Sequence, residues 1–120
     1  MPHVVVYNLS KIDYTKERIT EIKTAITATL CAISKIGLTG DKIAYSFPQD
    51  PTIESDEVAV KIIIAEFYDS PEITPELRNF TAKVVAETFK GVVTGWRRLK
   101  SVSVSIPRFD PHRDGHATVR

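Results

Sequence analysis

The sequence is poor in the features that mark several special classes of protein. Its single cysteine, Cys31, cannot form an internal disulfide, which is typical of a reducing compartment. Its longest apolar runs, such as residues 62–65, fall far short of the roughly 20 residues that cross a bilayer, and no secretory signal is visible at the start. The formal net charge of +1 argues against a protein built to neutralise nucleic-acid phosphates. We therefore expect a cytoplasmic protein with neither a membrane nor a nucleic acid as its partner.

The length and composition of the sequence are typical of one globular domain over residues 1–120. Of the 120 residues, 42% are hydrophobic and 26% are charged, which excludes an intrinsically disordered chain. Alternation, helical periodicity and turn residues predict six elements. They are strands over residues 2–9, 42–47, 58–67 and 97–106, one helix over 14–36, and a second helix from 74 to Gly91 or Gly95.

The order of these elements is βαβ followed by βαβ. Residues 1–48 form the first unit, residues 57–107 the second, and residues 108–120 a polar tail. The helix starts at Thr15 and Thr74 lie 59 residues apart, which suggests an internal duplication. In each unit a crossover helix joins two parallel strands. The predicted fold class is therefore α+β, with a four-stranded mixed sheet and two helices on one face.

Such a sheet leaves its other face uncovered. The third strand has apolar side chains in alternation on both faces. One face of this strand carries Val58, Val60, Ile62 and Ile64, and the other carries Ala59, Ile63, Ala65 and Phe67. The residues expected in the buried stripe of the second helix are Leu77, Phe80, Val84, Val85 and Thr88. Because one layer of helices buries only one face, we expect a homo-oligomer in which a neighbouring subunit covers the other.

The residue best suited to chemistry is Pro2. Removal of the initiator methionine would leave Pro2 as a free secondary amine. At a partly buried strand end the charged form is desolvated, and nearby cations lower the pKa further, so the amine is expected to be neutral near pH 7. A neutral, rigid amine can take a proton from a carbon next to a carbonyl and return it elsewhere. A purely structural role, in which the proline only starts a strand, stays open at this point.

Three cations in strands are further candidates. Lys61 lies inside the apolar third strand, where it either grips a carboxylate or extends its ammonium group to solvent. Arg97 and Arg98 lie at the entry of the fourth strand, where they either contribute to anion binding across an interface or form a solvated strand end.

Two aromatic residues and the C-terminal tail are the remaining candidates for a functional role. Tyr45 and Phe47 alternate along the second strand, where they pack in the core or form a wall of the pocket. In the tail, His112 and His116 alternate with aspartates, but the proline and glycine among them favour an irregular polar segment over a metal site. We expect no metal and no cofactor.

With Pro2 leading a strand in a chain of two βαβ halves, the sequence resembles the tautomerase superfamily. That group includes 4-oxalocrotonate tautomerase, 5-carboxymethyl-2-hydroxymuconate isomerase and macrophage migration inhibitory factor. The resemblance covers residues 2 to about 107. The opening Pro2-His3 is similar to that of the muconate isomerase, and residues 37–47, with Ile43-Ala44, are similar to a helix-to-strand junction of the inhibitory factor.

The resemblance implies a function and a set of site residues. Pro2 would be the catalytic base of a cofactor-independent tautomerase or isomerase that acts on a small 2-oxo or enol carboxylic acid. It also implies a trimer with active sites near subunit boundaries. Lys11 and Lys42 fall near positions where the small tautomerase has arginines, so they would bind the substrate carboxylate. Leu38 stands where the inhibitory factor has its active-site lysine, and this departure leaves the substrate open.

Two other functions stay open. The order βαββαβ is also the ferredoxin-like pattern, so the chain is alternatively a non-catalytic domain that binds a small ligand or regulates a partner. A tautomerase-like scaffold with hydratase or dehalogenase activity, or with none, is the third possibility. Retained Met1 would block the amine and favour the non-catalytic function.

Overall fold

The computed structural model describes residues 2–10, 13–49, 58–67, 73–94 and 99–107. Its elements are β1 (His3–Tyr7), α1 (Lys16–Cys31), the short 3-10 helix η2 (Gly40–Lys42), β2 (Ala44–Ser46), β3 (Val58–Ala65), α2 (Pro75–Val93) and β4 (Leu99–Ser105). This order matches the predicted one. Within the described residues, neither helix has the length and the apolar character needed to span a bilayer.

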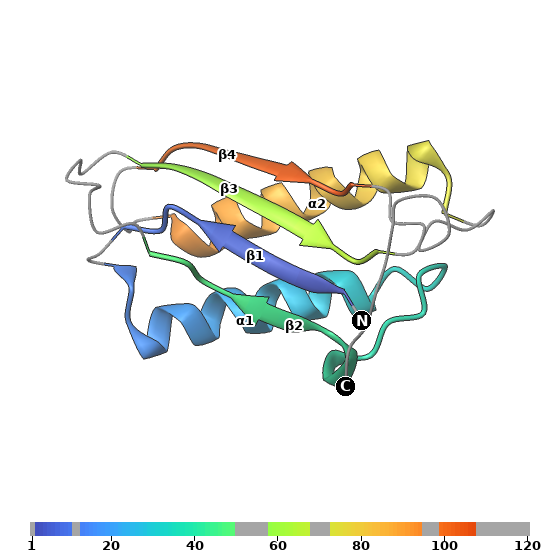
Figure 1. Ribbon diagram of the computed structural model, residues 1–120, viewed down its shortest axis with the longest axis horizontal. Coiled ribbons are helices and arrows are strands. Elements are labelled where there is room, and N and C mark those ends of the chain that lie inside the picture. The colour runs from blue at the N-terminus through green and yellow to red at the C-terminus, as the bar shows by residue number, and fades with distance from the viewer. Residues whose placement is uncertain (1, 11–12, 50–57, 68–72, 95–98, 108–120) are drawn as a thin grey trace, which may run out of the picture.

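The four strands form one mixed sheet in the order β2-β1-β3-β4 (Figure 1). β1 runs parallel to β2, β3 runs parallel to β4, and the two central strands β1 and β3 are antiparallel. The predicted fold class is confirmed. In a ferredoxin-like split βαβ unit another strand separates the two parallel strands. Here they are paired directly, so the sheet does not have the ferredoxin-like arrangement.

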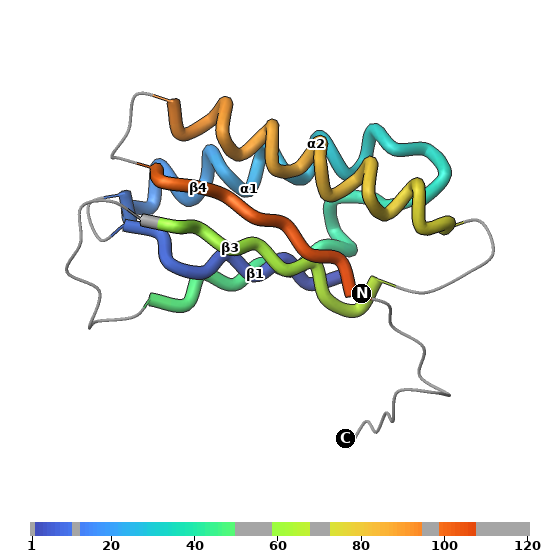
Figure 2. Tube along the Cα trace, turned by 90° about the horizontal axis from the view of Figure 1, so that it is seen from above, coloured from blue at the N-terminus to red at the C-terminus, as the bar shows by residue number. Residues whose placement is uncertain are grey.

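Both helices cover the same face of the sheet, so the domain has two layers (Figures 1 and 2). Alternate strand residues point into the space between the layers. The largest fully buried side chains of the core are Val4, Val6, Val60, Ile62 and Ile64 from the sheet, Ile22, Ile26, Leu30, Val85 and Phe89 from the helices, and Phe67. The three- and four-residue spacing of Ile19, Ile22, Ile26, Leu30 and Ile33 predicts one apolar stripe on α1, and Ile22, Ile26 and Leu30 of this stripe are buried.

Threonine caps start both helices. The Thr15 hydroxyl accepts a hydrogen bond from the Arg18 amide, and the Thr74 hydroxyl accepts one from the Leu77 amide, with Pro75 in the first turn. These starts are as predicted. α1 is shorter than expected, since regular helix ends at Cys31 and the chain continues in tighter i→i+3 turns as far as residue 36.

The buried stripe of α2 differs from the expected one. It consists of Arg78, Thr81, Val85, Phe89 and Val93, whereas the side chain of Phe80 is 52% exposed. Two apolar stripes were possible on this helix. The structure uses the one that contains an arginine and a threonine, and the terminal guanidinium nitrogens of Arg78 and the hydroxyl of Thr81 find nearby carbonyls.

Phe67 also departs from the expectation. Alternation along the third strand places Phe67 on the same face as Ala59, Ile63 and Ala65, but only 2% of Phe67 is exposed and it belongs to the core. Glu66 adopts a positive φ of 59°, which breaks the strand alternation and turns Phe67 inward.

The two halves meet at equivalent positions. The hydroxyls of Thr29 in α1 and Thr88 in α2 are hydrogen-bonded at 2.9 Å, and these residues are 59 positions apart. The N-caps Thr15 and Thr74 have the same separation. A contact between matching residues is what two similar βαβ halves produce when they pack about a local twofold axis.

Candidate active site

Pro2 stands at the entrance to the central strand of the sheet, and its position is fixed. Its carbonyl accepts a 3.0 Å hydrogen bond from the Ala44 amide, and the next residue, His3, is paired with Ala44 of β2 and Ala65 of β3. The proline itself is buried, on the same side of the sheet as Val4. With Met1 removed, the amine would therefore begin a rigid strand that has neighbours on both sides.

A buried arginine lies at the same end of the sheet. Arg78 belongs to the first turns of α2, and only 7% of it is exposed. Its Nη1 atom is 3.5 Å from the Ile106 carbonyl and 3.4 Å from the Pro107 carbonyl, and its Nη2 atom is 3.5 Å from the Phe67 carbonyl. Sequence reasoning missed this residue. The available signal was its position at the head of the run 78, 81, 85, 89, where an apolar residue is expected.

Of the predicted cations that the structure describes, Lys42 is the one at the Pro2 end of the sheet. It is the last residue of η2, two positions before the amide that binds the Pro2 carbonyl, and its side chain is exposed. The neighbouring Asp41 accepts a 2.6 Å hydrogen bond from the Thr39 hydroxyl, which holds the pKa of that carboxyl below its ordinary value. Asp41 therefore stays ionised near neutral pH and partly offsets the charge of Lys42.

Lys61 lies too far along the sheet to reach Pro2 in the same subunit. It pairs with Tyr7 of β1 and Ser103 of β4, on the face without helices. Tyr7 is five residues from Pro2, which corresponds to roughly 17 Å along a strand. A role for Lys61 beside Pro2 therefore requires a second subunit.

The other three predicted cations, Lys11, Arg97 and Arg98, lie outside the described residues. Of the two predicted carboxylate-binding cations that the structure describes, only Lys42 lies at the Pro2 end of the sheet, so the described part of one chain does not gather these side chains around Pro2.

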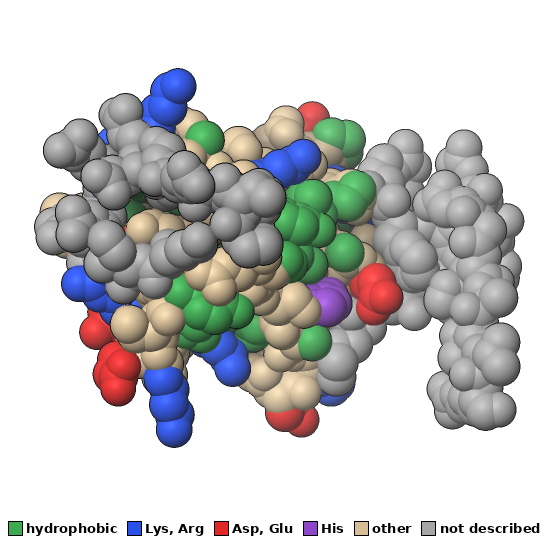
Figure 3. All heavy atoms as spheres, turned by 60° about the vertical axis from the view of Figure 1, so that its left-hand side comes forward, with side chains coloured by type: hydrophobic (Ala, Val, Ile, Leu, Met, Phe, Trp, Pro, Cys, Tyr) green, Lys and Arg blue, Asp and Glu red, His purple; other side chains and the backbone are tan. Residues whose placement is uncertain are grey.

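The face of the sheet without helices has an apolar centre. Val5 pairs with Ile63 there, and Ala65 pairs with His3, all half-buried. The Nε2 atom of His3 is 2.5 Å from the Ser46 hydroxyl across β1 and β2. Figure 3 shows this face obliquely, with hydrophobic side chains next to the histidine. An apolar centre between polar residues is typical of a surface that another subunit covers.

Tyr45 and Phe47 point toward α1. The Tyr45 hydroxyl is 2.7 Å from the Thr27 hydroxyl and donates a 3.3 Å hydrogen bond to the Lys23 carbonyl. The two aromatic rings are stacked with centroids 6.4 Å apart. These contacts anchor β2 to α1, which is the packing role that the sequence allowed. Their role as a pocket wall stays a prediction.

Burial raises the pKa of the Tyr45 hydroxyl, and the Thr27 hydrogen bond opposes this only in part. A raised folded-state pKa stabilises the fold below the ordinary tyrosine pKa, and this contribution is lost as the pH rises through the folded value. We therefore expect the urea midpoint of the wild type to fall more steeply above about pH 10 than that of Tyr45→Phe. Tyr7→Phe, which removes an exposed hydroxyl, is the control. Parallel pH profiles for wild type and Tyr45→Phe would contradict this prediction.

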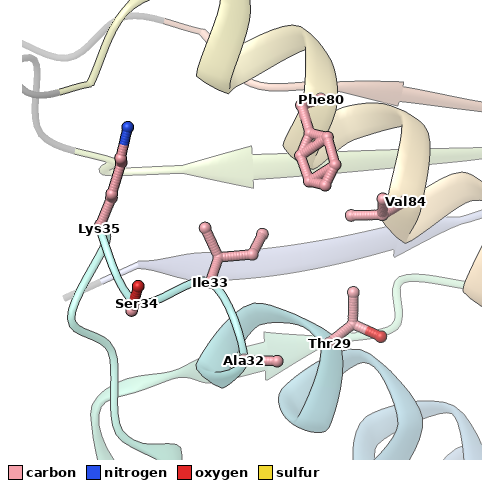
Figure 4. A pocket seen from close by; sticks show the side chains of 7 residues that line it. All are labelled: Thr29, Ala32, Ile33, Ser34, Lys35, Phe80 and Val84. Carbon is pink, nitrogen blue, oxygen red and sulfur yellow. The ribbon is translucent and has the colours of Figure 1, made fainter.

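Two pockets formed by described residues lie elsewhere. One, of about 510 Å³, is a groove between the end of α1 and the first half of α2 (Figure 4). Phe80 and Val84 point into it from α2 and face Ile33 and Thr29, while Lys35 extends away at one side (Figure 4). The other, of about 390 Å³, lies between α2 and β4. Pro2 lines neither.

Metal ligation finds no support in the described part of the chain. No three His, Cys, Asp or Glu side chains come together there in a way that could hold a metal ion. His112 and His116 lie outside the described residues.

Comparison with solved structures identifies the architecture. A 5-carboxymethyl-2-hydroxymuconate isomerase from Deinococcus radiodurans matches 98% of this chain and 90% of its own, with a TM-score of 0.64 and 15% identity. The protein Pt0534, solved after inactivation by 2-oxo-3-pentynoate, matches 96% of this chain and 92% of its own, with a TM-score of 0.67 and 15% identity. The chain has the tautomerase-like fold.

A third solved structure bears on assembly. A fused 4-OT, described as an asymmetric trimer, matches 88% of this chain and 86% of its own, with a TM-score of 0.56 and 13% identity. No family model matches the sequence, and no curated protein matches it. At these identities the likeness concerns the fold, and the residues that act must be argued from this chain itself.

Proposed function

We propose that the protein is a cofactor-independent tautomerase or isomerase that uses Pro2 as a general base on a small 2-oxo or enol carboxylic acid. The observation that carries the proposal is the position of Pro2. It is a buried residue, immobilised at the start of the central strand by the Ala44 amide, and processing of Met1 would make it the chain's terminal amine.

The chemistry needs only one proton carrier. The lone pair of the Pro2 nitrogen takes the enol O–H proton, which leaves an enolate and a prolinium ion. The prolinium ion then gives a proton to the enolate carbon, so the carbonyl forms and the amine is neutral again. Each step is a proton transfer, and the ring restricts the nitrogen to one direction of approach.

The substrate carboxylate and the enolate need cations, and we propose that adjacent subunits supply most of them. Among the predicted cations that the structure describes, Lys42 lies at the Pro2 end of the sheet, while Lys61 lies about five strand residues away. Lys11, Arg97 and Arg98 are the remaining candidates. An assembly that brings the far end of one sheet to the Pro2 end of the next would complete the site. The trimeric fused 4-OT and the apolar sheet face support such an assembly.

The substrate class rests on charge and on the structural neighbours. A site completed by lysine and arginine favours an anionic substrate, and the neighbour Pt0534 is inactivated by a small 2-oxo acid. Another structural neighbour is named as a 5-carboxymethyl-2-hydroxymuconate isomerase. These observations support a keto–enol proton transfer better than a non-catalytic ligand domain.

A direct test compares a free and a blocked terminus. In the first preparation an N-terminal tag is kept, so the Pro2 nitrogen is blocked. In the second the tag is cleaved off, so the chain begins at Pro2 with a free nitrogen. We expect the processed protein to accelerate ketonisation of the enol of an aryl pyruvate, followed by absorbance, and the tagged protein to be inactive. A chain with a C-terminal tag controls for the tag itself. Equal rates with a free and a blocked nitrogen would rule out Pro2 as the base.

A further inference from the structure

We propose that Arg78 is a positioning residue of the Pro2 site, which it serves by fixing the strand ends beside Pro2 and by keeping the Pro2 amine uncharged near neutral pH. The effect of Arg78 on catalysis rests on the proposed function, in which Pro2 is the base. The physical content of the inference, a coupling between a buried guanidinium and the terminal amine, is measurable whether or not the protein turns over a substrate.

The contacts of Arg78 show what it holds. One guanidinium nitrogen approaches the carbonyls of Ile106 and Pro107, where the chain leaves β4, and the other approaches the carbonyl of Phe67, where it leaves β3. The guanidinium carbon also lies 5.5 Å from the centre of the Phe67 ring. A planar fork with several donors suits two strand exits at once, which a lysine ammonium does not. Arg78 therefore ties α2 to the ends of two strands.

Those strand ends are the neighbours of Pro2. The β1–β3 register places His3 opposite Ala65, so Pro2 is level with Glu66, directly before the carbonyl that Arg78 binds. Figures 1 and 2 both show the N-terminus at the end of the sheet where β3 and β4 finish. Pro2 is buried on the face that the helices cover, and Arg78 comes from one of those helices. Both groups thus lie between the two layers at one end.

Among the described residues, the other charges at this end are more exposed than Arg78. Lys42, Asp41, Glu66 and Glu76 are all exposed, carry one positive and three negative charges, and are screened by solvent and salt. His3 points to the opposite face, where it is hydrogen-bonded to Ser46. A charge that is only 7% exposed acts through a medium of lower effective dielectric, so the charge of Arg78 is screened less than these exposed charges.

The field has a definite sign. A positive charge beside an amine disfavours the protonated form, so the guanidinium lowers the pKa of Pro2. Loss of the charge would raise that pKa by roughly 0.5–1 unit, the order expected of one partly screened charge. A role confined to packing would not move it, because replacing one neutral packing group with another leaves the field unchanged.

The test is a titration of the Pro2 nitrogen by ¹⁵N NMR in the mature protein. Arg78→Met and Arg78→Gln both remove the charge but fill the buried site differently. If one of them fails to fold, the other still tests the proposal. We expect the Pro2 pKa to rise by roughly 0.5–1 unit in either variant and to stay within about 0.2 unit in Arg78→Lys, which keeps the charge. Lys83→Met, at an exposed position of α2, is the matched control and should leave the pKa unchanged.

Kinetics separate this proposal from the function proposed above. If turnover depends on Pro2, the acid limb of the kcat/KM profile should move with the NMR value in Arg78→Met or Arg78→Gln. If the NMR value moves but no ketonisation is detected in the wild type, the coupling stands and the proposed function fails. An unchanged Pro2 pKa in a folded, charge-removed variant, or a shift equal to that of Lys83→Met, would overturn the role assigned to Arg78.

Discussion

Pro2→Ala is expected to lower kcat/KM for enol ketonisation by roughly 100- to 10,000-fold, the range that general acid–base catalysis supplies. Alanine is also small, so Met1 should still be removed and the variant should still present a free amine. That amine is primary, has a freely rotating N–Cα bond and lacks the ring. The loss therefore measures the contribution of a secondary amine held in a single orientation.

The measurement is a set of initial rates at pH 7 with intact masses confirmed for each chain. Pro48→Ala is the matched control, because Pro48 is an exposed proline beyond the far end of β2 and should retain wild-type kcat/KM. Thermal unfolding of both variants shows whether the fold persists. A Pro2→Ala protein that is folded and as fast as the wild type would end the assignment of Pro2 as the base.

Val5→Lys is expected to dissociate the assembly. Val5 pairs with Ile63 at the apolar centre of the sheet face without helices. An ammonium group placed there would be desolvated without a partner when a second subunit covers the face, at a cost of about 3–5 kcal/mol. That corresponds to a loss in association of at least about 100-fold. The sheet inside each subunit should persist, because Val5 points away from the core.

Sedimentation velocity over a hundredfold range of concentration is the appropriate measurement. The wild type should be an oligomer and Val5→Lys largely a monomer, while Thr24→Lys, at an exposed position of α1, should assemble like the wild type. If adjacent subunits supply the cations of the site, dissociated Val5→Lys should also lose activity in proportion to the monomer fraction. A wild type that is monomeric throughout would contradict the assembly proposed from the sheet face.

The fold was predictable from local patterns because these patterns agree with one another. The N-caps Thr15 and Thr74, the stripe of α1 and the alternation of β4 each specify one element without ambiguity. The stripe of α2 was not predictable, since two stripes compete and the chosen one contains a buried arginine. Phe67 was missed because a single positive φ at Glu66 reverses the alternation, which no propensity of glutamate signals.

The site was predictable only in part. Pro2 could be found because its chemistry depends on its position in the sequence. The cations could not be placed, because their approach to Pro2 depends on the register of the strands and on subunit contacts. Lys61 illustrates this, since it lies in the same sheet as Pro2 of its own chain but near the opposite end of that sheet. Arg78 was missed because the competing stripe with Phe80 and Val84 is more apolar, so the position of Arg78 at the head of the run 78, 81, 85, 89 was not used.

The most direct measurement of the central claim is the protonation state of the chain's first nitrogen in the mature protein. Intact mass spectrometry should show a chain that begins at Pro2. ¹⁵N NMR should show that its nitrogen is neutral at pH 7, with a titration midpoint that coincides with the acid limb of kcat/KM. A chain that keeps Met1, or a Pro2 nitrogen that stays protonated at a pH where the enzyme turns over at full rate, would contradict the account.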